Sequence, residues 1–153
     1  MKTLLCIASI GFILSACNVS VKKEIKGLPI QGTWKLVSGT LIEKNDTTVT
    51  DYLEDKSFIK VINETHFAFM GHDLNKGKDS AAAFYSCGGG KYDLKDSAYT
   101  EHLEYCNARE WEGNDFKFTI VINNDTLTQS GVEKVESAGI NRINIEKYIR
   151  IKK

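Results

Sequence analysis

The chain has little of what marks several large classes of protein. Its 153 residues include one proline, and 20 basic residues balance 20 acidic ones, so the formal net charge at pH 7 is zero. A neutral chain lacks the electrostatic attraction that binds proteins to nucleic acids and acidic membrane surfaces. No internal repeat, low-complexity tract or sustained helical periodicity follows the first residues. These absences argue against a nucleic-acid partner, a repeat array and a helical fold.

What the chain does have is the composition of a folded domain. Hydrophobic residues make up 42% of it and charged residues 26%, which distinguishes it from a disordered chain. A chain of this length buries roughly 70% of its unfolded surface, enough for one self-sufficient core. We therefore expect a single globular domain, and we expect it to be a monomer.

The N-terminal residues predict a secretory signal. Lys2 precedes an eleven-residue apolar run, residues 4–14, which leads into Ser15-Ala16-Cys17. A short basic region, an apolar run and small residues before a cleavage site are typical of a signal peptide. Eleven residues are too few to cross a bilayer core, for which about 20 helical residues are needed. Residues 1–16 are therefore predicted to be removed.

The end of this signal also indicates lipid attachment. Leu14-Ser15-Ala16-Cys17 resembles the bacterial lipobox, in which the cysteine thiol is acylated and becomes the new N-terminus. Each buried methylene of an acyl chain such as palmitate contributes about 0.8 kcal/mol to membrane binding. The resemblance implies a lipoprotein anchored to a bacterial envelope membrane through Cys17, with the outer membrane favoured over the inner. The folded domain would face the periplasm or the cell surface. Residues 17–29 then form a lipidated tether, and residues 30–153 the folded domain.

Two cysteines remain beyond the anchor, Cys87 and Cys106. In an oxidising envelope, an even pair predicts a disulfide. A two-residue turn at Asp96-Ser97 sets a hairpin register in which the two cysteines lie directly opposite each other. Directly opposed strand residues have Cα atoms about 4.5–5.5 Å apart, a separation that a disulfide accepts. Two free, buried thiols are the alternative.

Segments rich in β-forming residues, divided by turn residues, predict an all-β fold. They are residues 32–42, 57–62, 65–70, 81–94, 97–106, 115–122, 126–134 and 140–152. Consecutive strands with short connections favour an antiparallel meander, and closure into a barrel removes its exposed edges. We predict an eight-stranded antiparallel up-and-down barrel, with a two-sheet sandwich as the alternative. The interior of such a barrel is either filled by side chains or just wide enough for one small ligand.

Several segments carry a family resemblance. Gly32-Thr33-Trp34 resembles the Gly-x-Trp signature of lipocalins, and Arg150 is similar to the basic residue that stacks on that tryptophan. Such a contact is a cation–π interaction that closes one end of the barrel. The chain is more specifically similar to the lipocalin-like domains of bacterial envelope lipoproteins, through residues 32–37, 65–69, 88–92, 99–101 and 146–150. The resemblance implies a lipocalin-like barrel with Trp34 and Arg150 as the closing pair. Residues 43–55 resemble the lid over its mouth.

A lipocalin-like barrel implies a candidate site for a small hydrophobic or amphipathic ligand in its interior. Alternation along residues 99–105 places Tyr99, Glu101 and Tyr105 on one face, which we expect to point inward. A glutamate among aromatic side chains needs a hydrogen-bond donor or a shifted pKa, and Arg150 or a tyrosine hydroxyl is the expected donor. The candidate ligand-binding residues are Phe67, Phe69, Tyr92, Tyr99, Glu101, Tyr105, Phe116, Phe118 and Tyr148. For the last strand, the residue pattern leaves the inward face open, and the resemblance favours Tyr148 and Arg150.

The sequence shows no motif for catalysis, a cofactor or a metal. His66, His72 and His102 lack a metal-binding spacing, and no serine or cysteine lies in a nucleophile motif. We therefore expect no enzymatic activity. Two functions remain open: a binding protein for a small apolar or amphipathic ligand, and a packed-core envelope module that contacts a protein or glycan through its surface. A fully ion-paired Glu101 with no adjoining cavity would favour the second.

Overall fold

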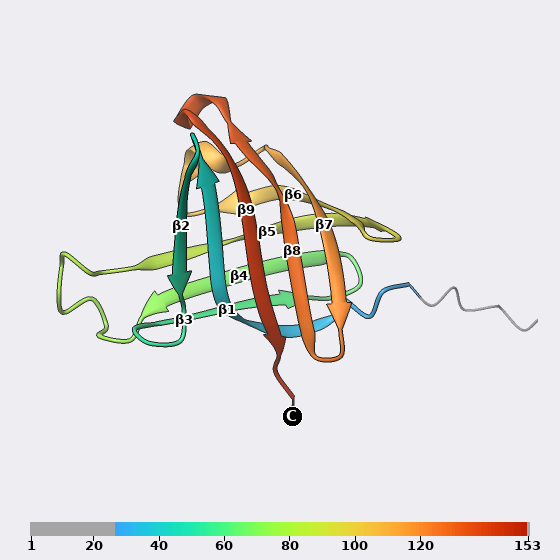
Figure 1. Ribbon diagram of the computed structural model, residues 1–153, viewed down its shortest axis with the longest axis horizontal. Coiled ribbons are helices and arrows are strands. Elements are labelled where there is room, and N and C mark those ends of the chain that lie inside the picture. The colour runs from blue at the N-terminus through green and yellow to red at the C-terminus, as the bar shows by residue number, and fades with distance from the viewer. Residues whose placement is uncertain (1–26, 153) are drawn as a thin grey trace, which may run out of the picture.

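The computed structural model describes residues 27–152, which form an antiparallel β-barrel (Figure 1). Its strands are β1 (Gly32–Glu43), β2 (Asp46–Asp51), β3 (Lys56–Ile62), β4 (His66–Asp73), β5 (Tyr85–Lys95), β6 (Ala98–Cys106), β7 (Asp115–Asn123), β8 (Thr126–Val135) and β9 (Ile140–Arg150). The short 3-10 helices η1 (Arg109–Trp111) and η2 (Glu136–Ala138) follow β6 and β8. Within this part of the chain, no helix is long and apolar enough to cross a membrane. The predicted signal, Cys17 and residues 18–26 of the predicted tether lie outside the described residues.

Eight of the strands close into a ring. β1 pairs with β3 on one side and with β9 on the other, and each of the strands from β3 to β8 pairs with the next along the chain. The eight-stranded up-and-down barrel predicted from the sequence is therefore confirmed, and the two-sheet sandwich is wrong. In Figure 1, β1, β7, β8 and β9 cross steeply over β3 to β6.

The ring is splayed at one end because two of its strand pairs are short. β1 pairs with β3 only over residues 32–35, and β6 pairs with β7 only over residues 98–102. Past these points β2 pairs with the second half of β1, and β6 runs on toward η1. The interior is therefore wider at this end than at the end where β1, β3 and β9 meet.

Trp34 and Arg150 close the narrow end. They are directly paired across β1 and β9, and the Arg150 guanidinium carbon lies 3.9 Å from the centroid of the indole ring. The fully buried Trp34 donates a hydrogen bond from Nε1 to the Ile30 carbonyl at 2.7 Å. Arg150 donates to the Gln31 carbonyl at 2.6 Å and to the Pro29 carbonyl. The predicted contact is thus present, and it also ties residues 29–31 across the end of the barrel.

Gly32, two residues before Trp34, lies where the structure requires a glycine. Gly32 has a φ of +138°, a conformation that other residues rarely adopt, and a Cβ there would lie 2.6 Å from Nη1 of Arg150. A glycine is therefore needed for the guanidinium to reach both the indole and the carbonyls. Leu28, in the predicted tether, already packs against the core.

A β-bulge changes the predicted register of the β5–β6 hairpin. The expected pairing holds from the turn as far as Gly90 with Leu103, but beyond it Gly89 pairs with Tyr105 and Gly88 with Cys106. A Cβ at Gly90 would lie 1.9 Å from the His102 carbonyl oxygen, so the bulge requires glycine there. The one-residue shift exchanges the two faces of the strand beyond the bulge.

The bulge overturns two predictions. Cys106 lines the interior, whereas Cys87, paired with the exposed Met70, follows the inward Ser86 and takes the opposite face. Both cysteines are free, so the predicted disulfide between Cys87 and Cys106 is wrong. Tyr105 is 68% exposed on the outer surface, so its expected inward orientation is wrong as well.

Residues 43–55, which the resemblance implied to be a lid loop, form a hairpin strand, and two of them, Thr50 and Tyr52, line the interior cavity. They contain β2, which forms a hairpin with β1 through a tight turn in which Lys44 and Asn45 have φ values of 49° and 69°. Turns with two positive φ values match the twist of paired strands. Of the two apolar residues after β2, Tyr52 turns over Gly39 of β1, and Leu53 is exposed.

Loss of the guanidinium should weaken the closed end. We expect Arg150→Met to lower the free energy of unfolding by about 2–4 kcal/mol, since it removes a cation–π contact and two charge-assisted hydrogen bonds. Urea unfolding measures the change. Arg109→Met is the matched control: its side chain is 81% exposed and pairs with Glu112 on the surface, so a change below about 0.5 kcal/mol is expected. Equal effects of the two substitutions would contradict the role given to Arg150.

His102 joins three strands on the outside of the barrel. Its Nε2 lies 3.0 Å from a carboxylate oxygen of Asp93 on β5, and its Nδ1 lies 2.8 Å from one of Asp115 on β7. These hydrogen bonds, with Asp93 first, raise the pKa of His102. The protonated ring donates to both carboxylates, whereas the neutral ring has one N–H to donate.

The stability that His102 contributes should therefore depend on pH. A raised pKa in the folded state means that the contribution is complete below the unfolded pKa of about 6.5 and is lost as the pH rises through the folded pKa. We expect His102→Gln to be more destabilising at about pH 5.5 than at about pH 9 in denaturant titrations. His66→Gln, whose ring contacts Thr65 and no carboxylate, should show no such trend. A pH-independent effect of His102→Gln would contradict the bridge.

Candidate functional site

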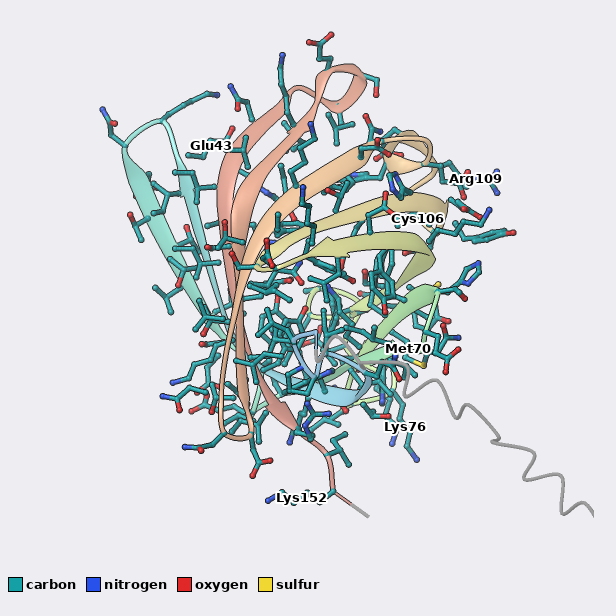
Figure 2. The ribbon with its side chains drawn as sticks, turned by 90° about the vertical axis from the view of Figure 1, so that its right-hand side faces the viewer. Glu43, Met70, Lys76, Cys106, Arg109 and Lys152 are labelled. Atoms are coloured by element: carbon teal, nitrogen blue, oxygen red, sulfur yellow. The ribbon has the colours of Figure 1, made fainter. Side chains whose placement is uncertain are left out.

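A cavity of about 340 Å³ lies inside the barrel, toward its splayed end. Glu43, at the β1–β2 turn, and Lys152, after β9, mark the two ends of the barrel (Figure 2). Along β1 the cavity is lined by Gly39 and Leu41 but not by Trp34, so it lies away from the closed end. Its volume is in the lower part of the range for small-molecule sites, about 300–1,000 Å³.

Aromatic side chains form much of the cavity wall. Phe58 and Phe69 stack with ring centroids 5.8 Å apart, and Tyr52 meets Phe58 edge-on at 5.9 Å. On the side of η1, Trp111 packs against Phe116 at 5.6 Å. The aromatic residues that line the cavity are Tyr52, Phe58, Phe69, Phe84, Trp111, Phe116, Phe118 and Tyr148. These rings give the site the apolar wall that small-molecule sites usually have.

A buried ion pair forms the polar part of the same cavity. The Lys60 ammonium on β3 donates to Glu101 Oε1 on β6 at 2.7 Å and to the Gln129 side-chain oxygen on β8 at 3.1 Å. An oxygen of Glu146 on β9 lies 3.9 Å from the same ammonium. The Lys60 and Glu101 side chains are 4% and 8% exposed. The expected donors to Glu101 were Arg150 and a tyrosine hydroxyl. Arg150 is wrong, because Lys60 is the close donor, while the Tyr99 hydroxyl also acts on this carboxylate and opposes the rise in its pKa that burial causes.

The pair has perturbed acid–base properties. Burial raises the pKa of Glu101, and the Lys60 charge opposes this effect. Burial alone would lower the pKa of Lys60, but the carboxylates of Glu101 and Glu146 outweigh it and raise that pKa. Lys60 therefore stays protonated at neutral pH. A protonated amine in this position has to keep a carboxylate partner, since a lone buried charge is strongly disfavoured.

A second polar cluster lies closer to η1. Glu133 on β8 accepts hydrogen bonds from Arg142 Nε at 2.8 Å and from the Asn144 amide at 2.7 Å. The Arg142 guanidinium also lies 5.4 Å from the ring centroid of Trp111. Burial raises the pKa of Glu133, and Arg142 opposes the rise. The Glu133 carboxylate and the Arg142 guanidinium are thus paired with each other within the barrel.

The predicted ligand-binding residues divide into three groups. Those that line the cavity are Phe69, Glu101, Phe116, Phe118 and Tyr148. Three others lie elsewhere in the barrel: Phe67 is buried, Tyr92 donates to the Asn63 carbonyl, and the buried Tyr99 ring lies 5.3 Å from that of Tyr92. Tyr105, on the outer surface, is apart from the site. The sequence thus predicted five of the cavity-lining residues correctly. It assigned the wrong face to Tyr105, near the end of β6.

Sequence reasoning missed most of the polar lining. The missed residues with large polar side chains are Lys60, Gln129, Glu133, Arg142, Asn144 and Glu146. A signal was available: these positions alternate with outward ones on strands whose other inward residues are apolar, such as Phe58 and Ile62 around Lys60. On β9, the inward face holds Tyr148 and Arg150, as the resemblance implied, and it carries the missed Arg142 and Asn144 too.

Neither a known family model nor a curated protein sequence matches this chain. The closed eight-stranded barrel is consistent with the lipocalin-like, or calycin, class of fold. Among residues 27–152, no group of three or more histidine, cysteine, aspartate or glutamate side chains is placed to hold a metal ion. The site is therefore defined by its own geometry: an aromatic wall beside two ion pairs, one buried and one part-buried.

Removing one member of the central ion pair should be costly. We expect Lys60→Met to lower the free energy of unfolding by about 3–5 kcal/mol, because it leaves Glu101 buried without its partner. The double variant Lys60→Met/Glu101→Leu removes both charges and should lie within about 2 kcal/mol of the wild type. Denaturant unfolding of the wild type, of Lys60→Met and Glu101→Leu singly, and of the double variant measures these effects. A double variant that loses as much as the two single variants together would contradict the pairing.

Proposed function

We propose that this protein is a lipid-anchored envelope protein whose barrel binds a small amphipathic ligand. The observation that carries the proposal is the cavity of about 340 Å³ beside Glu101. The ion pair of Glu101 would be compatible with a packed interior. The cavity next to Glu101 is not. A purely structural pair would be expected to sit in a filled core, because protein interiors are closely packed.

The lining supports an amphipathic ligand in preference to a purely apolar one. Rings such as Phe69 and Phe116 offer apolar contact, while Glu101 and Glu146 present oxygen atoms to the same space. An apolar chain buried against the rings gains about 25 cal/mol for each Å² removed from water. A polar head group beside the carboxylates would keep its hydrogen bonds, and a wholly apolar ligand would leave these groups without added partners.

The anchor supports the same proposal from the sequence. Acylation at Cys17 would hold the barrel close to a membrane, with residues 18–26 as the connection. Molecules that partition into membranes would then be concentrated around the barrel. We infer that the protein binds or carries such a molecule at the outer membrane and does not transform it.

One observation favours a second function, contact with another protein or a glycan through the outer surface. Tyr85 and Tyr105 are each 68% exposed, and Met70 is 44% exposed, on the neighbouring strands β4, β5 and β6. Exposed tyrosine and methionine are enriched at protein interfaces. This surface and the cavity are separate, so a substitution in each of them can show which one binds a ligand.

Native mass spectrometry of the full-length protein, extracted from its host membrane, tests the proposal. We expect a mass that lacks residues 1–16, carries acyl groups on Cys17 and includes a reproducible non-covalent adduct. Leu103→Trp adds a large ring to the cavity lining and should abolish the adduct. Tyr105→Trp, on the outer face of the same strand, is the matched control and should keep it.

Two outcomes would contradict parts of the proposal. Adduct-free protein in every preparation would favour the packed module, and an adduct lost in Tyr105→Trp but kept in Leu103→Trp would move the site to the outer surface. A mass that retains residues 1–16 would overturn the anchor. Circular dichroism of each variant establishes that the substituted proteins are folded.

A further inference from the structure

The charged side chains of the cavity do not balance. Three carboxylates line it, those of Glu101, Glu133 and Glu146, against two cationic side chains, Lys60 and Arg142. With all five groups ionised, the lining carries a formal charge of −1. Inside a barrel, such an excess is felt more strongly than on the surface, because the surrounding protein has a low dielectric constant.

The cations are already committed to the other two carboxylates. Lys60 donates to Glu101 at 2.7 Å, and Arg142 donates to Glu133 at 2.8 Å. Glu146 lies 3.9 Å from the Lys60 ammonium, beyond hydrogen-bond distance, and accepts a hydrogen bond at 2.8 Å from the neutral hydroxyl of Tyr148. Glu146 is therefore the one of these three carboxylates whose cationic neighbour is farthest away and forms no hydrogen bond to it.

Two tyrosines lie near this carboxylate: Tyr148, whose buried ring already has the Lys60 ammonium 5.3 Å from its centroid, and Tyr52, which lines the cavity. Tyr148 lies two residues along β9 and bonds to Glu146. Burial, and then the Glu146 charge, raises the pKa of Tyr52, so the Tyr52 hydroxyl is held in its neutral form. The Tyr52 ring meets Phe58 at 5.9 Å. Aromatic faces attract cations, and a carboxylate among aromatic rings forms the kind of site that holds amines and quaternary ammonium groups.

We propose that the cavity selects amphiphiles with a single cationic head group, an amine or a quaternary ammonium. The head lies beside Glu146 and the Tyr52 ring, and the apolar part lies against Phe69 and Phe116. An anionic head meets a lining that is already negative, and it would have to break the Lys60–Glu101 pair to reach the ammonium. This inference rests on the proposed function and gives its ligand a chemical class.

Three probes with the same chain and different head groups test the inference: octyltrimethylammonium, octanol and octanoate. Isothermal titration of the full chain, below the concentrations at which the probes aggregate, compares their affinities. We expect the cation to bind about tenfold more tightly than octanol, and octanoate to bind most weakly. Glu146→Gln keeps the hydrogen bond from Tyr148 and should remove the preference for the cation while leaving octanol affinity within about twofold.

Glu104→Gln is the matched control, since Glu104 is exposed on β6 and lies 4.0 Å from Lys91 on the surface. It should leave all three affinities unchanged. Equal binding of octanoate and the cation, or a preference that survives Glu146→Gln, would overturn the charge selection while the proposed binding function stands. If none of the three probes binds, the proposed function itself fails.

Discussion

The ion pair between Lys60 and Glu101 is the constraint on which the interior of this barrel depends. A buried ammonium needs hydrogen-bond acceptors, and here they come from β6 and β8, across the barrel from β3, while a carboxylate oxygen of β9 lies 3.9 Å away. The polar residues of four strands are thus arranged around one charge. On the side of Trp34 the interior is packed with apolar side chains, whereas on the other side it opens into the cavity.

Backbone pairing explains why the cavity lies at one end. The short β1–β3 and β6–β7 pairings let the strands diverge, while the contact between Trp34 and Arg150 holds the opposite end closed. The bulge at Gly90 turns Cys106 into the widened interior and Tyr105 out of it. The barrel therefore combines a rigid closed end with an aromatic cavity, an arrangement that suits binding of a small molecule.

Local sequence signals predicted the barrel but not the details that shape its site. Turn residues and alternation located the eight strands of the ring, and the Gly-x-Trp resemblance identified the contact of Trp34 with Arg150. The bulge has no comparable signal, because it depends on how closely Gly90 approaches the neighbouring strand. Lys60 was missed because a charged side chain in a strand usually faces water, and its partner lies 41 residues away. Long-range pairing of that kind is not visible in a single sequence.

The cavity beside the Lys60–Glu101 pair is, on this account, a ligand site. Nuclear magnetic resonance of the protein with octanol tests this most directly. Intermolecular Overhauser effects report which protons lie close to the bound chain. We expect contacts from the octanol chain to the ring protons of Phe69 and Phe116, which line the cavity. Contacts restricted to outward residues such as Tyr105 and Val121, or none at any octanol concentration, would contradict the account.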